Sequence, residues 1–131
     1  MQSIFGGGVL NQNVKIYKEN YVNLPGRFVE KIEHDIRFLL EADIKGLKKI
    51  YLFGSCARGD VRSSSDVDLL VVTDQKISDR ALAADIRWSL DEPVNGVKTD
   101  IVYKNEASEE MQNVFENIVK HEKKMILEVI G

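Results

Sequence analysis

The chain has 131 residues, of which 44% are hydrophobic and 30% are charged, and its formal net charge is −3. This length suits one compact domain, and the composition is that of a soluble globular protein and excludes a disordered chain. The small negative charge disfavours bulk binding of nucleic acid, and no apolar run approaches the roughly 18 residues that a membrane span requires.

The N-terminal segment differs in composition from the rest. It combines a glycine run, Gly6 to Gly8, with the polar stretch "NQN" at 11–13, which predicts a flexible arm over residues 1–23, with a short strand at "VKIY", ahead of a domain over residues 24–131. The start of the chain lacks the basic and sustained apolar segments of a secretory signal, and its one cysteine forms no internal disulfide. We therefore expect a cytoplasmic protein.

A helix is expected after Pro25, which suits a first helical turn, and Gly46 suits its stop. Apolar residues recur there at spacings of three and four, as on one face of a helix: Phe28, Val29, Ile32, Ile36, Leu39, Leu40 and Ile44. The stretches "KKIYLFGS" at 48–55 and "DVDLLVVT" at 66–73 predict two strands. The second is almost continuously apolar, so we expect it to be covered on both faces.

The second half of the chain predicts a helix, a strand and a further helix. Ser78 can cap a helix to about Leu90, whose apolar side carries Ile77, Leu82, Ile86 and Leu90. Pro93 and Gly96 then break the chain before a third strand at 96–104, "GVKTDIVYK". The last helix is expected from about Ser108, and "MILEVI" at 125–130 suits a strand or a helix end. This order predicts an α+β (two-layer α/β) domain, with a small mixed sheet flanked by helices.

Two aspartates stand at the start of the second strand, where Asp66 and Asp68 are two residues apart and point to the same face. Such neighbouring carboxylates repel each other and are costly near a core unless a cation or strong donors compensate for their charge. Mg²⁺ prefers oxygen ligands, and Asp100 on the third strand supplies another carboxylate. Three carboxylates suit a two-metal site for displacement at phosphorus.

A turn between the first two strands suits a phosphate. Gly54 and Ser55 end the first strand and open a short turn or helix, where a glycine allows close approach and backbone N–H groups and a hydroxyl face a ligand. Arg58 and Arg62 follow and can neutralise phosphate oxygens. Lysines at 45, 48 and 49 add to this local basic excess.

Each feature alone has an ordinary structural explanation, because Gly-Ser is common in turns and an isolated Asp-x-Asp usually faces solvent. The conjunction of all of them is what indicates a site. Other candidates are weaker: we expect structural roles for His34 and His121, a buried or half-buried thiol for Cys56, and packing of Trp88 against the sheet.

The stretch "GSCARGDVRSSSDVDLLV" resembles the signature of the DNA-polymerase-β-like nucleotidyltransferase superfamily, in which Gly-Ser is followed after ten residues by Asp-x-Asp. Gly54, Ser55, Asp66 and Asp68 match these positions. The pattern also favours Ala57, Arg58, Gly59 and Ser65, so Ser65 joins the candidate nucleotide-binding residues. By size the chain resembles the minimal nucleotidyltransferases (MNT), which are often encoded beside a HEPN-domain protein in toxin–antitoxin pairs.

The resemblance implies a Mg²⁺-dependent transfer of a nucleoside monophosphate, AMP from ATP, to a hydroxyl of a HEPN-type partner protein. Asp66, Asp68 and Asp100 would bind the metals, and Gly54, Ser55, Arg58 and Arg62 the phosphates. Two alternatives remain open. One is a small-molecule nucleotidyltransferase, like those that modify aminoglycosides, with an acceptor pocket completed by dimerisation. The other is a non-catalytic module that binds a partner through its surface.

Overall fold

The computed structural model describes residues 13–107 and 122–130. These form one five-stranded mixed sheet in the order β1-β5-β2-β3-β4. The strands are β1 (Val14–Ile16), β2 (Leu47–Phe53), β3 (Val67–Thr73), β4 (Thr99–Asn105) and β5 (Lys124–Val129). All neighbouring pairs are antiparallel except β3 and β4, which are parallel. The predicted α+β class is confirmed.

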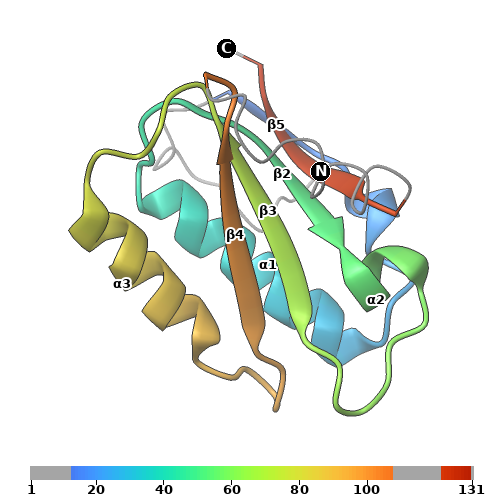
Figure 1. The fold of residues 1–131 in the computed structure, drawn as a ribbon. Coiled ribbons are helices and arrows are strands. Elements are labelled where there is room, and N and C mark those ends of the chain that lie inside the picture. The colour runs from blue at the N-terminus through green and yellow to red at the C-terminus, as the bar shows by residue number, and fades with distance from the viewer. Residues whose placement is uncertain (1–12, 108–121, 131) are drawn as a thin grey trace.

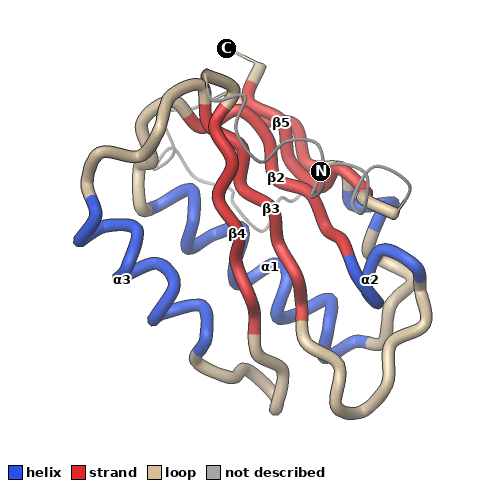
Figure 2. Tube along the Cα trace, viewed as in Figure 1, coloured by secondary structure: helices blue, strands red, loops and turns tan. Residues whose placement is uncertain are grey.

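Two long helices, α1 (Gly26–Glu41) and α3 (Arg80–Asp91), lie on the same face of this sheet (Figures 1 and 2). A 3-10 turn, η1 (Lys18–Asn20), follows β1, and the short helix α2 (Gly54–Arg58) follows β2 directly. The helix α3 connects the two parallel strands, as a parallel connection requires. Among the described helices, none has the length and apolar character needed to cross a membrane.

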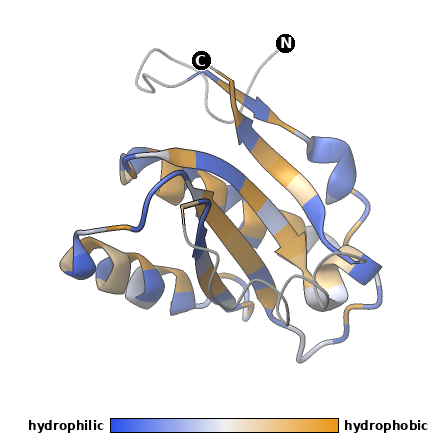
Figure 3. Cartoon of the chain, turned by 45° about the horizontal axis from the view of Figure 1, so that its top comes forward, coloured by the Kyte–Doolittle hydropathy of each residue, from blue (hydrophilic) through white to orange (hydrophobic). Residues whose placement is uncertain are grey.

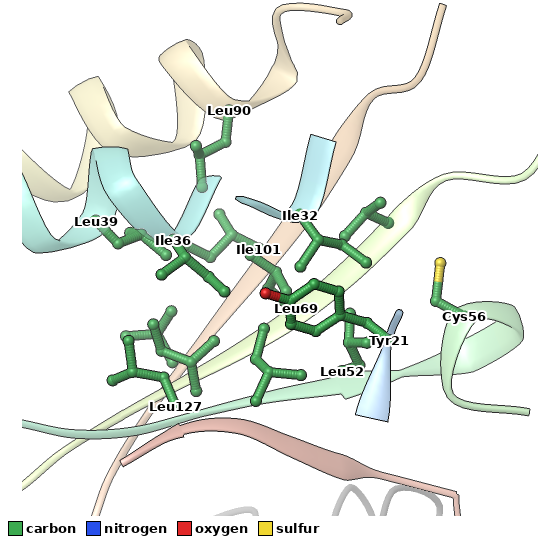
Figure 4. Packing of buried hydrophobic residues seen from close by; sticks show 14 of the residues in the cluster. Tyr21, Ile32, Ile36, Leu39, Leu52, Cys56, Leu69, Leu90, Ile101 and Leu127 are labelled. Atoms are coloured by element: carbon green, nitrogen blue, oxygen red, sulfur yellow. The ribbon is translucent and has the colours of Figure 1, made fainter. Parts of the chain in front are cut away.

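The core lies between the sheet and the two long helices. Figure 4 shows Ile32, Ile36 and Leu39 of α1 and Leu90 of α3 facing side chains of the sheet. Side chains of β3 alternate between this core and a second cluster on the opposite face, where Leu70 and Val72 are buried. The expectation that this strand is covered on both faces is therefore confirmed. In Figure 3 hydrophobic colour concentrates on the strands, and hydrophilic colour on the connecting loops.

The segment before α1 is more closely packed than an arm. The short strand expected at "VKIY" is present as β1, which pairs with β5 at the sheet edge. Tyr21 is 1% exposed and donates a hydrogen bond to Glu33 of α1 at 3.0 Å. Residues 13–23 thus belong to the packed fold because an aromatic ring and a strand edge fix them, whereas residues 1–12 lie outside the described part.

Two expectations about α3 are wrong. Its N-cap is Asp79, whose carboxylate accepts a hydrogen bond from the Leu82 N–H at 2.9 Å, and Ser78 precedes it. A carboxylate at this position also interacts favourably with the positive end of the helix dipole. Trp88 does not pack on the sheet, because its side of α3 faces away, and it is 82% exposed. The helix expected from Ser108 lies outside the described residues. Of the stretch "MILEVI", residues 125–129 belong to strand β5, and Ile130 follows it.

Candidate active site

The end of β2 passes directly into α2 at a glycine with a left-handed backbone. Gly54 has φ +69°, and a Cβ added there would overlap Oδ2 of Asp68 and lie 3.3 Å from its Cγ. The carboxylate of Asp68 therefore rests against the backbone of Gly54. Both the backbone conformation and this close approach require glycine at the position that the motif predicted.

Helix α2 is short and closed by its own turn. The carbonyl oxygen of Ser55 accepts hydrogen bonds from the N–H groups of Gly59 at 2.8 Å and Asp60 at 3.2 Å. Cys56 is 2% exposed, and its thiol donates to the carbonyl oxygen of Asp66 at 3.7 Å. Burial, and then the charges of Asp68 and Asp66, raise the pKa of this thiol to about 12. Cys56 thus joins α2 to the start of β3 as a neutral packing group, as expected from the sequence.

The loop from α2 to β3 carries two of the predicted nucleotide-binding residues. The hydroxyl of Ser65 accepts a hydrogen bond from the Arg62 N–H at 2.7 Å, and the Ser65 N–H donates to the Arg62 carbonyl at 3.0 Å. Arg27 of α1 donates from Nη2 to the carbonyl of Ser63 at 3.0 Å, and its guanidinium lies 4.6 Å from the ring centroid of Phe28. Ser65 therefore shapes the loop, Arg62 is exposed on it, and Arg27 is an anchor that the sequence did not reveal.

The three predicted aspartates lie at, or directly before, the starts of β3 and β4, and these two strands begin at the same end of the sheet (Figure 1). Asp68 on β3 and Asp100 on β4 are direct partners in the parallel register. Side chains at paired positions of neighbouring strands point to the same face. Asp66 is exposed immediately before β3. The strand therefore starts one residue later than predicted, with Asp66 in the preceding loop.

The electrostatics of Asp68 reflect this gathering. Burial, then the negative charges of Asp100 and Asp66, raise its pKa to about 6, and the nearby Arg58 opposes that shift. Among the described residues, no group of three or more His, Cys, Asp or Glu side chains is arranged so that it could hold a metal ion. The site nevertheless fits a cation, because a half-buried carboxylate with two acidic neighbours and a displaced pKa is a donor set whose repulsion a cation relieves.

Arg58 acts on Asp68 through its charge and contacts Glu122, two residues before β5. Its Nε lies 3.2 Å from Oδ2 of Asp60, and its Nη1 lies 3.1 Å from Oε2 of Glu122. Glu122 also contributes to the raised pKa of Asp68. Spacing along the chain does not indicate Glu122, because it lies far from the motif in sequence and is brought to the site by the adjoining strand β5, which pairs with β2. His34 has the expected structural role, with Nδ1 3.1 Å from Oδ1 of Asp35, and His121 lies outside the described residues.

Comparison with known protein families agrees with this geometry. Residues 29–128 match the family model described as "Nucleotidyltransferase domain". The chain belongs to this family. A nucleotidyltransferase is an enzyme whose reacting groups are phosphates, which suits carboxylates facing a Gly-Ser turn and an arginine. No curated protein matches the chain in sequence.

Solved structures of toxin–antitoxin complexes are similar to this nucleotidyltransferase. One is a mutant of the complex MntA–HpeT with two aspartates changed to glutamate; it is 26% identical over 71% of this chain and 70% of that chain, with a TM-score of 0.53. A toxin–antitoxin with AMP-PNP is 30% identical; the match covers 71% of this chain and 70% of that chain, with a TM-score of 0.47. A third similar structure is that of a tri-AMPylated Shewanella oneidensis HEPN toxin in complex with MNT antitoxin. It is 28% identical; the match covers 71% of this chain and 66% of that chain, with a TM-score of 0.44.

Proposed function

We propose that this nucleotidyltransferase transfers AMP from ATP to a hydroxyl group of a HEPN-type partner protein, in the manner of an MNT antitoxin. The observation that carries the proposal is the pairing of Asp68 with Asp100 across β3 and β4, with the Asp68 carboxylate against Gly54. This places acidic groups and a predicted phosphate-binding turn at one end of the sheet. The similarity to the MntA–HpeT complex supports the assignment to a toxin–antitoxin pair.

Asp66, Asp68 and Asp100 are the residues that would hold Mg²⁺ in this proposal. When bound, the metal supplies charge neutralisation and polarisation of the phosphate oxygens. Burial, and then the negative charges of Asp100 and Asp66, raise the pKa of Asp68, and this supports the role because a cation would offset both effects. The glycine at position 54 leaves room for the Asp68 carboxylate beside the backbone.

The triphosphate would lie at α2. Gly54 and Ser55 offer backbone N–H groups, and the hydroxyl of Ser55 adds a donor for the β- and γ-phosphates. Arg58 is 46% exposed and engages two carboxylates, so a phosphate can compete with Asp60 and Glu122 for its N–H donors. Arg62 is exposed on the adjoining loop, which Ser65 and Arg27 hold, and adds a second positive charge.

The chemical step is a displacement at the α-phosphorus of ATP. The acceptor hydroxyl oxygen forms a bond to that phosphorus, and the bond between the phosphorus and the bridging oxygen breaks, which releases pyrophosphate. Asp100 is exposed and takes the proton of the hydroxyl as general base. The contribution of this chain is mainly positioning and charge neutralisation, as in other phosphoryl transfers.

The direct test uses the protein coexpressed with the product of its neighbouring gene. The purified pair is incubated with ATP and Mg²⁺, and the partner's mass is measured. We expect the partner to gain the mass of one or more AMP groups, and Asp68→Asn and Asp100→Asn to abolish the gain. Asp85→Asn on the exposed side of α3 is the matched control and should retain it.

Two outcomes would redirect the proposal. If the purified chain alone modifies a small hydroxyl compound and leaves every partner unmodified, the enzyme belongs with the small-molecule nucleotidyltransferases. If Asp66→Ala/Asp68→Ala neutralises the partner as well as the unchanged protein does, binding alone explains the function. Full transferase activity in that double variant would refute the site assignment.

A further inference from the structure

A charged network is buried on the opposite side of β4 from the site. Lys31 and Asp35, one turn apart on α1, are both 0% exposed, and Nζ of Lys31 lies 2.7 Å from Oδ1 of Asp35. The same Nζ donates to the carbonyl oxygen of Leu90, in the last turn of α3, at 2.8 Å. The hydroxyl of Thr99, the first residue of β4, donates to Oδ2 of Asp35.

These contacts join three elements at one point. Lys31 and Asp35 come from the middle of α1, Leu90 from the end of α3, and Thr99 from the start of β4. Leu90 belongs to the same buried hydrophobic cluster as Ile36 and Leu39 of α1, which Figure 4 labels together. Each charged group has a partner, since the ammonium donates to a carboxylate and to the negative end of a helix dipole. The network therefore fixes where the chain enters β4 after α3.

Thr99 and Asp100 are consecutive residues of a strand, so their side chains point to opposite faces. Thr99 is 4% exposed and points toward α1, whereas Asp100 is exposed and is the register partner of Asp68. The hydrogen bond between Thr99 and Asp35 therefore lies on the opposite face of β4 from the Asp100 carboxylate, one residue away along the strand. The N–H of Val67, which donates to the carbonyl of Lys98 at 2.9 Å, completes the alignment of the two strand starts.

Stability is a poor explanation for this network. Replacing a buried ion pair by apolar residues of similar volume is often neutral or stabilising, because the desolvation of two charges offsets most of their attraction. Apolar packing has no preferred direction, whereas a hydroxyl donating to a carboxylate defines a single arrangement. What apolar residues could not replace is the defined position of Thr99.

We propose that Lys31, Asp35 and Thr99 are positioning residues, which hold the start of β4 so that Asp100 stays beside Asp68. This inference rests on the proposed function only through the role of Asp100. None of the three side chains touches the site, since all three lie on the face of the sheet that α1 covers. Their effect on the reaction passes through the backbone of β4.

The test compares Thr99→Val, which removes the hydroxyl at constant shape, with Thr99→Ser, which keeps it. For Thr99→Val we expect kcat to fall by about 100-fold, the loss typical of a misplacement of about 1 Å, with KM for ATP within about twofold. Thr99→Ser should stay near the unchanged protein. Thr73→Val is the matched control, because Thr73 is 1% exposed and donates to the Gln75 carbonyl at 2.6 Å at the far end of β3.

A second variant separates a loss of positioning from a loss of folding. It replaces the whole network by apolar side chains of similar volume: Lys31→Met/Asp35→Leu/Thr99→Val. We expect this variant to unfold cooperatively, as a folded protein does, and yet to lose kcat as Thr99→Val does. Unchanged kcat in either folded variant would overturn the inference.

Amide hydrogen exchange, which requires no enzymatic activity, tests this inference independently of the proposed function. If the unchanged protein transfers no AMP, the proposed function fails, and amide hydrogen exchange decides about the network. Thr99→Val should accelerate exchange by tenfold or more relative to β2 at Asp100 and Val102, whose N–H groups face β3 in the parallel register, and Thr73→Val should leave both amides unchanged. Equal exchange at those amides in the unchanged protein and in Thr99→Val would refute the positioning role.

Discussion

The contact between Gly54 and Asp68 leads to a prediction that distinguishes the effect of a substitution on stability from its effect on activity. In Gly54→Ala the new Cβ overlaps Oδ2 of Asp68, and the left-handed backbone at φ +69° is retained. A side chain in this conformation costs about 1–2 kcal/mol. The carboxylate relieves the overlap by rotating away, at about 1 kcal/mol for a displaced rotamer. We therefore expect the free energy of unfolding to fall by about 2–3 kcal/mol.

The effect on activity should be larger than this strain suggests. To reach an ordinary contact distance the Asp68 oxygen must retreat by about 1 Å, and misplacement on that scale costs about 100-fold in rate. The assay is initial-rate AMP transfer to the coexpressed partner, measured beside urea unfolding of each variant. We expect Gly54→Ala to be folded at assay temperature and to retain about 1% of kcat.

The chain itself offers two matched controls. Gly59 has φ +81° and no heavy atom within 4 Å of an added Cβ, so Gly59→Ala carries the strain alone. Gly46 has φ +77°, and an added Cβ would lie 3.0 Å from Cγ of Asp74, so Gly46→Ala carries strain and an acidic overlap far from the site. Both should lose stability and keep kcat within a few fold. If Gly59→Ala lowered kcat as far as Gly54→Ala, the contact with Asp68 would not explain the effect.

Three further predictions follow from the electrostatics of the site. Because the folded pKa of Asp68 is raised to about 6 from 3.8, the folded state binds more protons than the unfolded state between these values, so stability falls as pH rises through this window. Because solvent screens this half-buried group, Asp68→Asn should raise the free energy of unfolding at pH 7 by about 1–2 kcal/mol, with no gain below about pH 4. Urea unfolding at several pH values would measure this, and a gain that persists at pH 3 would contradict the cause given. Since burial raises the pKa of Cys56 to about 12, a thiol reagent at pH 8 should modify it only after denaturant is added, and rapid labelling of the native protein would contradict its burial. Arg58→Ala removes two surface ion pairs, so stability should change little while KM for ATP rises; an unchanged KM would remove Arg58 from the phosphate site.

Periodicity was sufficient to predict the elements whose pattern is long and regular. The apolar spacing of α1 and the continuous apolar run of β3 both describe side chains that are buried in the structure. The same rule, applied consistently, would have placed Trp88 outside. At 3.6 residues per turn it lies about 200° around α3 from Ile86 and from Leu90, the two buried residues of that helix. Aromatic character alone therefore does not predict burial on this helix, whereas position around its axis does.

Besides Asp100, which the pattern of the third strand already indicated, the site could be predicted only in its local part. The Gly-Ser turn and Asp66 and Asp68 lie within one stretch of sequence, so their spacing describes a loop between two strands. The contributions of Arg27 and Glu122 depend on contacts with α1 and β5, which spacing does not encode. Lys31 and Asp35 gave no signal at all, because charged residues beside an apolar stripe are ordinarily exposed. Only the packing of three elements reveals that they are buried.

The two faces of β4 make the register of this strand unusually well specified. A slip by one residue would turn Asp100 toward α1 and Thr99 toward the site, because strand side chains alternate. The slipped strand would bring the carboxylate of Asp100 against the buried carboxylate of Asp35, and it would leave Asp35 without the hydroxyl that now donates to it. An unpaired charge buried in this way is among the most costly errors in a fold. The register that satisfies Asp35 is therefore the same register that places Asp100 beside Asp68.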